Sequence, residues 1–151
     1  PMSAGGYNNH LRLLQTSEYI VIYTEQIHDA RIIPMDGRAN LAGNIEQWMG
    51  SSRGRWDGET LVVETRNFNG KASFQGSSSA LYLIERFTRR DADTLTYEYT
   101  LEDPETYMRA WTASLDLKPL AGDMYEFACH EGNYGMTNLL AGARAEERSG
   151  R

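Results

Sequence analysis

The dipeptide Asp57-Gly58 constrains the fold of this chain more than any other feature of its sequence. It lies within residues 53–68, where it separates two segments that are suited to β-strands. Asp-Gly is among the strongest short signals for a hairpin, because a tight turn between antiparallel strands needs residues that tolerate positive φ. We therefore expect a β-hairpin folded about this dipeptide.

Similar strand-forming segments, rich in β-branched and aromatic residues, occur along most of the chain. Compact turns such as Asp103-Pro104-Glu105 separate several of them, and the pattern contains no crossover helix. Besides the hairpin, the predicted strands are residues 11–15, 19–27, 30–35, 80–89, 94–102, 106–118 and 124–129. This order predicts an all-β fold, in which an antiparallel meander closes into a small β-barrel that is lipocalin-like in outline. A β-sandwich is the alternative.

The hydrophobic period changes near the C-terminus. Four apolar residues recur at the spacing of one helical face: Met136, Leu139, Leu140 and Ala143. This spacing predicts one amphipathic helix over residues 133–148, which we expect to pack on the sheet. Residues 1–9 are rich in Gly and Asn, and we expect them to form an irregular lead-in. A length of 151 residues is typical of one domain, so we expect residues 1–151 to make a single domain.

The composition excludes several classes of partner. The formal net charge is −6, whereas nucleic-acid binding depends on clustered Lys and Arg, so we expect no nucleic-acid partner and favour a small neutral or cationic ligand, or none. No apolar run approaches the roughly 20 residues that span a bilayer, so we expect no membrane partner. The chain has one cysteine, Cys129, which excludes an internal disulfide.

Charged residues recur on strand faces that are otherwise apolar. Alternation along residues 80–89 places Glu85 with leucines, Arg109 shares a face with Trp111, and Glu25 follows Tyr23 at the next position of its face. An unpaired ion in a core costs several kcal/mol, so these groups must be paired, neutralised or hydrated. One alternative is a buried Glu85–Arg109 pair that fixes strand register. The other is a ligand pocket in which a carboxylate with a shifted pKa performs acid–base chemistry.

Two histidines form a second candidate set. His28 and His130 both lie at predicted strand ends beside an acidic residue, and an imidazole near a carboxylate suits proton transfer near neutral pH. With one of Glu25, Glu126 or Glu131 they would also match a two-histidine, one-carboxylate metal site. Nothing in the spacing requires a metal, so we expect neither a metal nor a cofactor.

Two polar segments could also face a ligand. Ser51, Ser52 and Arg53 lie in a Gly-flanked stretch that could present hydroxyl groups, although a tight turn into the following strand explains the same pattern. Residues 67–79 form a long polar connection, of the kind that serves either as a functional rim or as a solvent-exposed loop.

These features predict a β domain that binds a small organic molecule in a polar interior and acts as a cofactor-independent hydrolase or lyase. The predicted acid–base residues are Glu25, Glu85, His28 and His130, and the predicted substrate contacts are Arg31, Arg109, Tyr23, Tyr99 and Trp111. The alternative is a non-catalytic ligand-binding or dimerisation domain, in which the same ions are internal struts and a sheet edge or the helix forms a homodimer.

Four separated blocks of the sequence resemble a bacterial protein family that is frequent in soil and environmental genomes. The blocks are residues 28–38, 54–71, 85–87 and 128–134 together with 142–147. No reaction, cofactor or catalytic residue set is established for this family, so the resemblance supplies none. Members often carry an exported region ahead of a block similar to Tyr7-Asn8-Asn9. The resemblance thus implies the C-terminal domain of a longer, periplasmic protein, or a fragment recovered from environmental DNA.

Overall fold

Eight strands and one long helix make up the computed structural model, which describes residues 9–71, 74–125, 132 and 134–150. The strands form two antiparallel sheets, with orders β1-β2-β3 and β4-β5-β6-β7-β8. The strands are β1 (Leu11–Gln15), β2 (Tyr19–Thr24), β3 (Ala30–Pro34), β4 (Ser51–Asp57), β5 (Thr60–Arg66), β6 (Tyr82–Asp91), β7 (Thr94–Glu102) and β8 (Trp111–Leu117). Each sheet is therefore a meander of consecutive strands, as the spacing of the turns predicts.

The predicted hairpin is confirmed, with its loop one residue later than expected. Asp57 pairs with Thr60 as the last rung of the β4–β5 ladder, so Gly58 and Glu59 form the loop. Gly58 has φ +61°, which suits the first position of a two-residue turn with glycine leading. Asp57 extends the strand instead of starting the turn.

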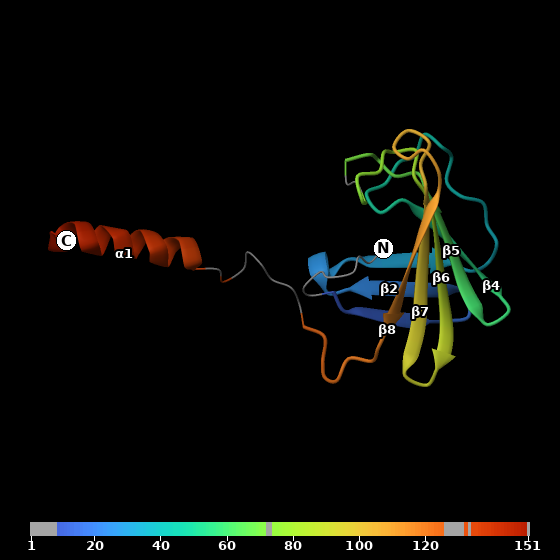
Figure 1. Cartoon of the computed structure of the whole chain (residues 1–151), viewed down its shortest axis with the longest axis horizontal. Coiled ribbons are helices and arrows are strands. Elements are labelled where there is room, and N and C mark those ends of the chain that lie inside the picture. The colour runs from blue at the N-terminus through green and yellow to red at the C-terminus, as the bar shows by residue number, and fades with distance from the viewer. Residues whose placement is uncertain (1–8, 72–73, 126–131, 133, 151) are drawn as a thin grey trace.

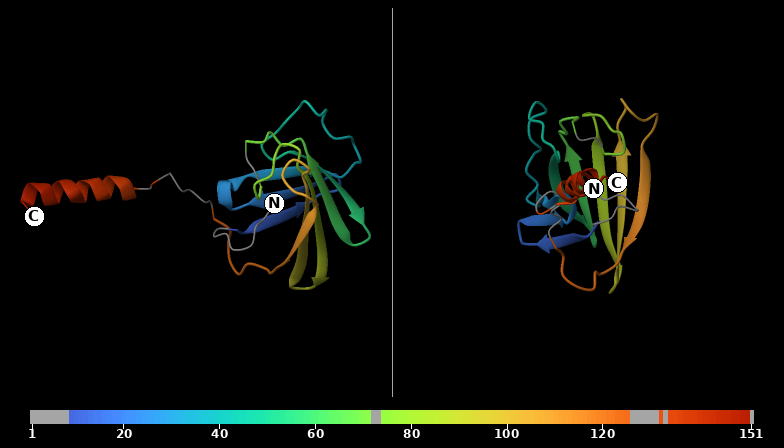
Figure 2. Two further views of the ribbon diagram at one scale, coloured as in Figure 1. Left: turned by 45° about the horizontal axis from the view of Figure 1, so that its top comes forward. Right: turned by 90° about the vertical axis from the view of Figure 1, so that its left-hand side faces the viewer.

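The two sheets pack face to face, and the strands of the small sheet run across those of the large one (Figures 1 and 2). Their inner faces share one apolar core, which includes Ile20, Ile22, Ile33, Leu61, Val63, Leu83, Phe87, Tyr97 and Leu101. Gly54 allows the close approach of β3 and β4. A Cβ at this position would collide with Met35 Sδ and would lie 3.0 Å from Ile33 Cγ2.

Ladder pairing joins neither β3 to β4 nor β8 to β1 in the described part of the chain. The strands therefore form two sheets there, and a closed barrel is not observed. The connection from β3 to β4 is irregular.

Apart from shifts of one to three residues at the ends of other strands, such as β2, which ends at Thr24, three predicted elements differ from the structure. The last strand of the large sheet begins at Trp111, because Thr106 and Tyr107 donate their backbone N–H groups to Asp103 O and hold a turn. Of the strand predicted over residues 124–129, Met124 and Tyr125 are irregular, and the remainder lies outside the described residues.

The third difference is the packing of helix α1 (Gly135–Ser149). The helix exists as predicted, but none of its residues is buried, and it stands apart from both sheets in Figure 1. The inner faces of the sheets already cover each other, and the outward positions of β6 and β7 carry polar residues such as Arg86, Thr96 and Glu98. The outer face of β6 and β7 is therefore polar, which does not favour packing of the helix on it. In the described residues, no helix combines the length and the apolar character needed to span a membrane.

Candidate functional site

A buried ion pair joins the two sheets at the centre of the molecule. Glu85 lies in the middle of β6, where alternation turns its side chain inward with Leu83 and Phe87, and it is 1% exposed. Arg31 of β3 faces it from the other sheet and is 7% exposed. Arg31 Nη1 donates to Glu85 Oε1 over 3.1 Å, and Nη2 donates to Oε2 over 2.5 Å. This two-pronged geometry is the strongest that a guanidinium and a carboxylate can form.

Three neutral side chains complete what we term the buried polar network. Tyr97 Oη donates to Glu85 Oε1 over 2.9 Å. Arg31 Nη2 also donates to Ser52 Oγ and Thr65 Oγ1, each over 3.2 Å, and these two hydroxyl oxygens lie 2.9 Å apart. The network takes one residue from each of β3, β4, β5, β6 and β7. It therefore fixes the registers of five strands and the docking of the two sheets.

The network holds Glu85 in its ionised form. Burial is the largest influence and would raise the pKa of this carboxyl, but the charge and hydrogen bonds of Arg31 and the Tyr97 hydroxyl together lower the pKa to about 2. Burial would lower the pKa of Arg31, but the Glu85 carboxylate outweighs burial and raises it. A general acid or base works best with a pKa near the working pH. Glu85 is consequently held as an anion, which suits a structural role better than proton transfer.

The sequence identified Glu85 as an inward-facing acid and named the wrong partner for it. The expected Glu85–Arg109 pair does not form, because Arg109 lies exposed in the turn between β7 and β8. Arg31 is the partner of Glu85 instead. Arg31 alternates with Ala30 and Ile32 and shares its face with Ile33, so the period-2 pattern of this short strand already carried the signal.

Glu25, the second predicted acid, pairs with a residue that the sequence did not suggest. Its Oε2 lies 2.5 Å from His10 Nδ1, and its backbone N–H donates to His10 O over 3.0 Å. Leu11 pairs with Thr24 in the β1–β2 ladder, so His10 and Glu25 meet just beyond the end of that ladder. Glu25 is buried, whereas His10 is half-exposed.

Of the two predicted histidines, His28 is the one in the described part of the chain, and its backbone N–H donates to Glu25 O over 3.1 Å. His28 is exposed at the end of the short 3-10 helix η1 (Gln26–His28), with φ 42°. His130 lies outside the described residues, as do Glu126 and Glu131 of the metal alternative. Among the residues that the structure describes, no group of three or more His, Cys, Asp or Glu side chains is placed to hold a metal ion.

The predicted aromatic contacts belong mainly to packing. Tyr99 and Trp111 meet edge to face with ring centroids 5.9 Å apart, and Phe74 covers Tyr99 at 5.4 Å. Tyr107 lies 5.8 Å from Trp111 and donates its hydroxyl to Gln75 O, which ties the polar connection over these rings. Tyr23 is half-buried on β2, away from this cluster in sequence and sheet.

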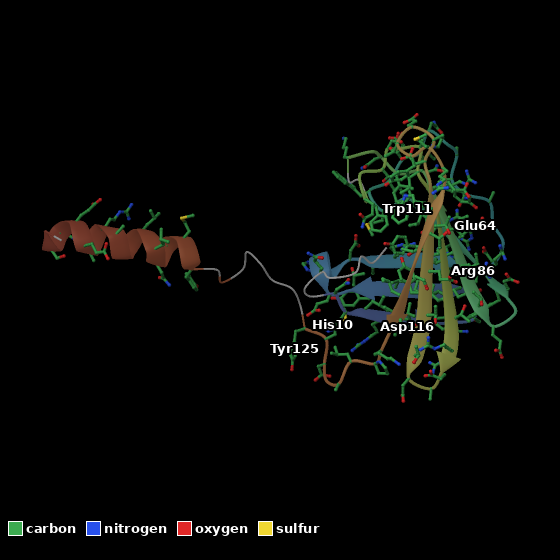
Figure 3. The ribbon with its side chains drawn as sticks, in the orientation of Figure 1. His10, Glu64, Arg86, Trp111, Asp116 and Tyr125 are labelled. Atoms are coloured by element: carbon green, nitrogen blue, oxygen red, sulfur yellow. The ribbon has the colours of Figure 1, made fainter. Side chains whose placement is uncertain are left out.

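A cavity opens between β1 and β8, two strands at the edges of their sheets. It has a volume of about 530 Å³ and is lined by leucines from β1, β7 and β8, namely Leu11, Leu13, Leu95, Leu115 and Leu117. Polar side chains at its rim include His10, Arg89, Asp116 and Lys118. Figure 3 labels His10 and Asp116, and it shows Trp111 at the opposite end of β8. We term this cavity the sheet-edge cleft.

The rim of the cleft is held by hydrogen bonds. Lys118 Nζ donates to Thr94 Oγ1 over 2.5 Å, and Asp116 accepts from Thr96 Oγ1 over 3.1 Å. Asp116 also forms an ion pair with Arg90 of β6, with 2.9 Å between Oδ2 and Nη1. These contacts link β6 and β7 to the end of β8. The cleft thus combines an apolar wall with a polar rim that is already positioned, as small-molecule sites usually do.

Comparisons of the chain with protein-family models, with curated proteins and with solved structures give no significant match.

Proposed function

We propose that this protein binds a small organic molecule in the sheet-edge cleft and holds it without chemical change. The cleft volume of about 530 Å³ carries the proposal, because it falls within the range of about 300–1,000 Å³ typical of small-molecule sites. The leucine wall suits an apolar body. His10 and Lys118 at the rim suit a polar end group that accepts hydrogen bonds.

The position of the cleft also supports this function. A barrel made from these strands would have to pair β1 with β8, and Leu11, Leu13, Leu115 and Leu117 of these two strands line the cleft. In our proposal the fold is an incompletely closed barrel, and the ligand occupies the gap. The buried polar network then acts as the strut that keeps the two sheets apart at a fixed distance.

The test is a fluorescence titration with N-phenyl-1-naphthylamine, a neutral apolar probe. We expect saturable binding to the unchanged protein. Leu13→Trp fills the cleft and should raise the Kd at least about tenfold. Leu14→Trp is the matched control, because the neighbouring residue points to the other face of β1, is exposed and does not line the cleft. Equal binding by both variants, with unchanged circular dichroism, would contradict the proposal.

A second candidate function is acid–base catalysis at the same cleft. The close Glu25–His10 contact favours it, since His10 lines the cleft and Glu25 orients its imidazole. If a turnover assay with activated esters detects hydrolysis, Glu25→Gln and His10→Gln should each reduce it by a factor of about 100 or more. Glu102→Gln, an exposed change at the end of β7, should not. Hydrolysis that survives both site variants would remove this pair from the mechanism.

Homodimerisation is the remaining proposal. The apolar residues Met136, Leu139 and Leu140 of α1 are exposed, which favours assembly through the helix. Light scattering of the unchanged protein and of Leu139→Glu tests it. A dimer that becomes a monomer in the variant supports assembly, and a monomer in both samples contradicts it.

A further inference from the structure

A second pocket lies beside β3, the edge strand of the small sheet that is opposite β1. It has a volume of about 260 Å³ and opens between β3, the connection of residues 35–50, and the beginning of β4. We term it the arginine pocket, because its charged lining residues are Arg31, Arg38 and Arg53. Neither an aspartate nor a glutamate lines it. The lining of the pocket is thus positively charged, although the whole chain has a net charge of −6.

The charges of the pocket do not cancel in the described part of the chain. Glu85 neutralises Arg31, and Asp36 neutralises Arg38. Arg53 has no carboxylate partner among the described residues. Its donors go to neutral oxygens, the carbonyls of Arg38, Ala39 and Ser52 and the hydroxyl of Ser51. A half-buried guanidinium thus adds one uncompensated positive charge beside two paired ones.

The pocket also contains hydrogen-bond donors that are still available. Arg31 Nε is buried and has no hydrogen-bond partner among the described residues. Ser51 Oγ accepts a hydrogen bond from Arg53, and no acceptor for the Ser51 hydroxyl proton is found in the described residues. A buried donor without an acceptor is unfavourable, so an acceptor that enters the pocket would recover free energy.

The local chain geometry places these donors together. Gly50 precedes Ser51 with φ +67°, and a Cβ there would come within 2.7 Å of both Arg66 O and Thr65 Cγ2. Glycine therefore lets the chain turn tightly against β5 as β4 begins. The same turn brings Ser51, Ser52 and Arg53 to one wall of the pocket, opposite Ala30 and Ile32 of β3.

We propose that the arginine pocket binds a compact oxyanion, of the carboxylate or phosphate type. Positive charge without a carboxylate in the lining favours an anion over a cation or a neutral ligand. Guanidinium and hydroxyl donors are the groups that recognise anionic oxygens. This site is separate from the sheet-edge cleft, and the two proposals stand or fall independently.

The test is a two-dimensional NMR titration of the amides with sodium phosphate and, separately, with sodium acetate. Sodium chloride keeps the ionic strength constant, because nonspecific attraction to exposed charges is screened by salt. We expect saturable shifts of the amides in residues 30–32 and 50–53. Saturation by phosphate, by acetate or by both supports the site and identifies its preferred anion. Shifts that rise linearly for both anions, or that spread over the exposed arginines, would overturn it.

Two pairs of variants sharpen the test. Ile32 lines the pocket but is 64% exposed, so Ile32→Glu adds a negative charge at the pocket without disturbing the core, and Ile32→Gln is its neutral control. We expect the glutamate variant alone to raise the Kd, by about fivefold or more. Equal affinity in the two variants would contradict the proposal.

Arg53→Gln removes the uncompensated charge, and Arg55→Gln removes an exposed charge two residues along β4. The first should raise the Kd at least about tenfold and the second should leave it unchanged. Arg53→Lys separates charge from geometry, since it keeps the positive charge and loses the forked guanidinium donors. Leu13→Trp, which blocks the sheet-edge cleft, should leave anion binding intact; loss of both activities in this variant would show that the pockets are not separate.

Discussion

Two arginine–carboxylate pairs in this protein share the same contact distance and differ in almost everything else. The shortest N–O separation is 2.5 Å in both Arg31–Glu85 and Arg38–Asp36. The side chains of the first pair are 6% and 1% exposed, and those of the second are 50% and 41% exposed. The first pair joins residues 54 positions apart in two sheets, whereas the second joins residues two positions apart in one connection.

The pKa of the carboxyl group does not distinguish the two pairs either. Hydrogen bonds from Arg38 lower the pKa of Asp36 to about 2, and the pKa of Glu85 is also about 2. What differs is the consequence of losing a partner. Water replaces Arg38 around Asp36, but nothing replaces Arg31 around Glu85. Burial, and not distance or pKa, decides which pair stabilises the fold.

The largest expected effect is that of Arg31→Met. It leaves the Glu85 carboxylate buried without its counter-ion, which typically destabilises a protein by about 3–5 kcal/mol. Urea denaturation at pH 7 measures the free energy of unfolding. Arg55→Met, on exposed β4 surface, is the control and should change it little. A loss of stability no greater than that of the control would contradict the assignment of Arg31 as the essential counter-ion.

The next effect is a loss of stability in acid. The pKa of Glu85 is lowered from 4.5 to about 2 in the folded protein, so its contribution is complete above pH 4.5 and is lost as the pH falls through about 2. At about 1.4 kcal/mol for each pH unit between these values, the loss is about 3 kcal/mol. Unfolding free energies measured from pH 7 to pH 2 should show it. Asp36→Asn should alter the profile much less, because Arg38 is exposed and only two residues away, so the unfolded chain can keep part of the same contact.

Tyr97→Phe should have an intermediate effect. The change removes the hydroxyl that donates to Glu85 and keeps the ring that stacks on Phe87 at 4.7 Å. A hydrogen bond to a charged group contributes about 1.5–3 kcal/mol, which thermal or urea unfolding resolves. Tyr99→Phe is a buried control, since the Tyr99 hydroxyl makes no hydrogen bond to the described residues. Equal effects of the two changes would mean that the hydroxyl of Tyr97 is not part of the network.

The double change Arg31→Met with Glu85→Leu should cost far less than Arg31→Met alone. Apolar side chains of similar size need no counter-ion, and such replacements are often neutral or stabilising. The acid-dependent loss described above should also disappear in this variant. A double variant as unstable as the single one would show that Ser52 and Thr65 require the charged partners.

The smallest effect is that of Arg38→Ala. Since Arg38 and Asp36 are exposed and adjacent in sequence, the midpoint of urea unfolding should not move measurably. A shift comparable to that of Tyr97→Phe would contradict the comparison between the two pairs.

The sequence predicts the strands and their faces well because both depend on local pattern. The bounds of β1 and β7 are those expected, and Leu81, Leu83, Glu85 and Phe87 are all buried as the alternation requires. Contacts between the sheets are different. Arg31 and Glu85 meet only when a short strand and a long one dock across each other, and nothing in either strand encodes that crossing.

The same limit explains the other residues that the sequence missed. His10 lies before its strand in an irregular segment, and only the register of the β1–β2 ladder brings it to Glu25. The sequence does not single out Tyr97, because the partner of its hydroxyl belongs to a neighbouring strand. For helix α1 the predicted element is present, but its predicted packing on the sheet is wrong. Its amphipathic pattern was correct, but pattern alone does not supply a surface for it to pack on.

The order of the strands has one further consequence. Each sheet is made from an uninterrupted piece of chain, so a cut within residues 36–46, inside the irregular connection, would break no strand ladder. The two resulting fragments would each carry one half of the ionic junction, with Arg31 on the shorter and Glu85 on the longer. This molecule is thus a natural candidate for fragment complementation, in which reassembly reports directly on whether a guanidinium has found its carboxylate.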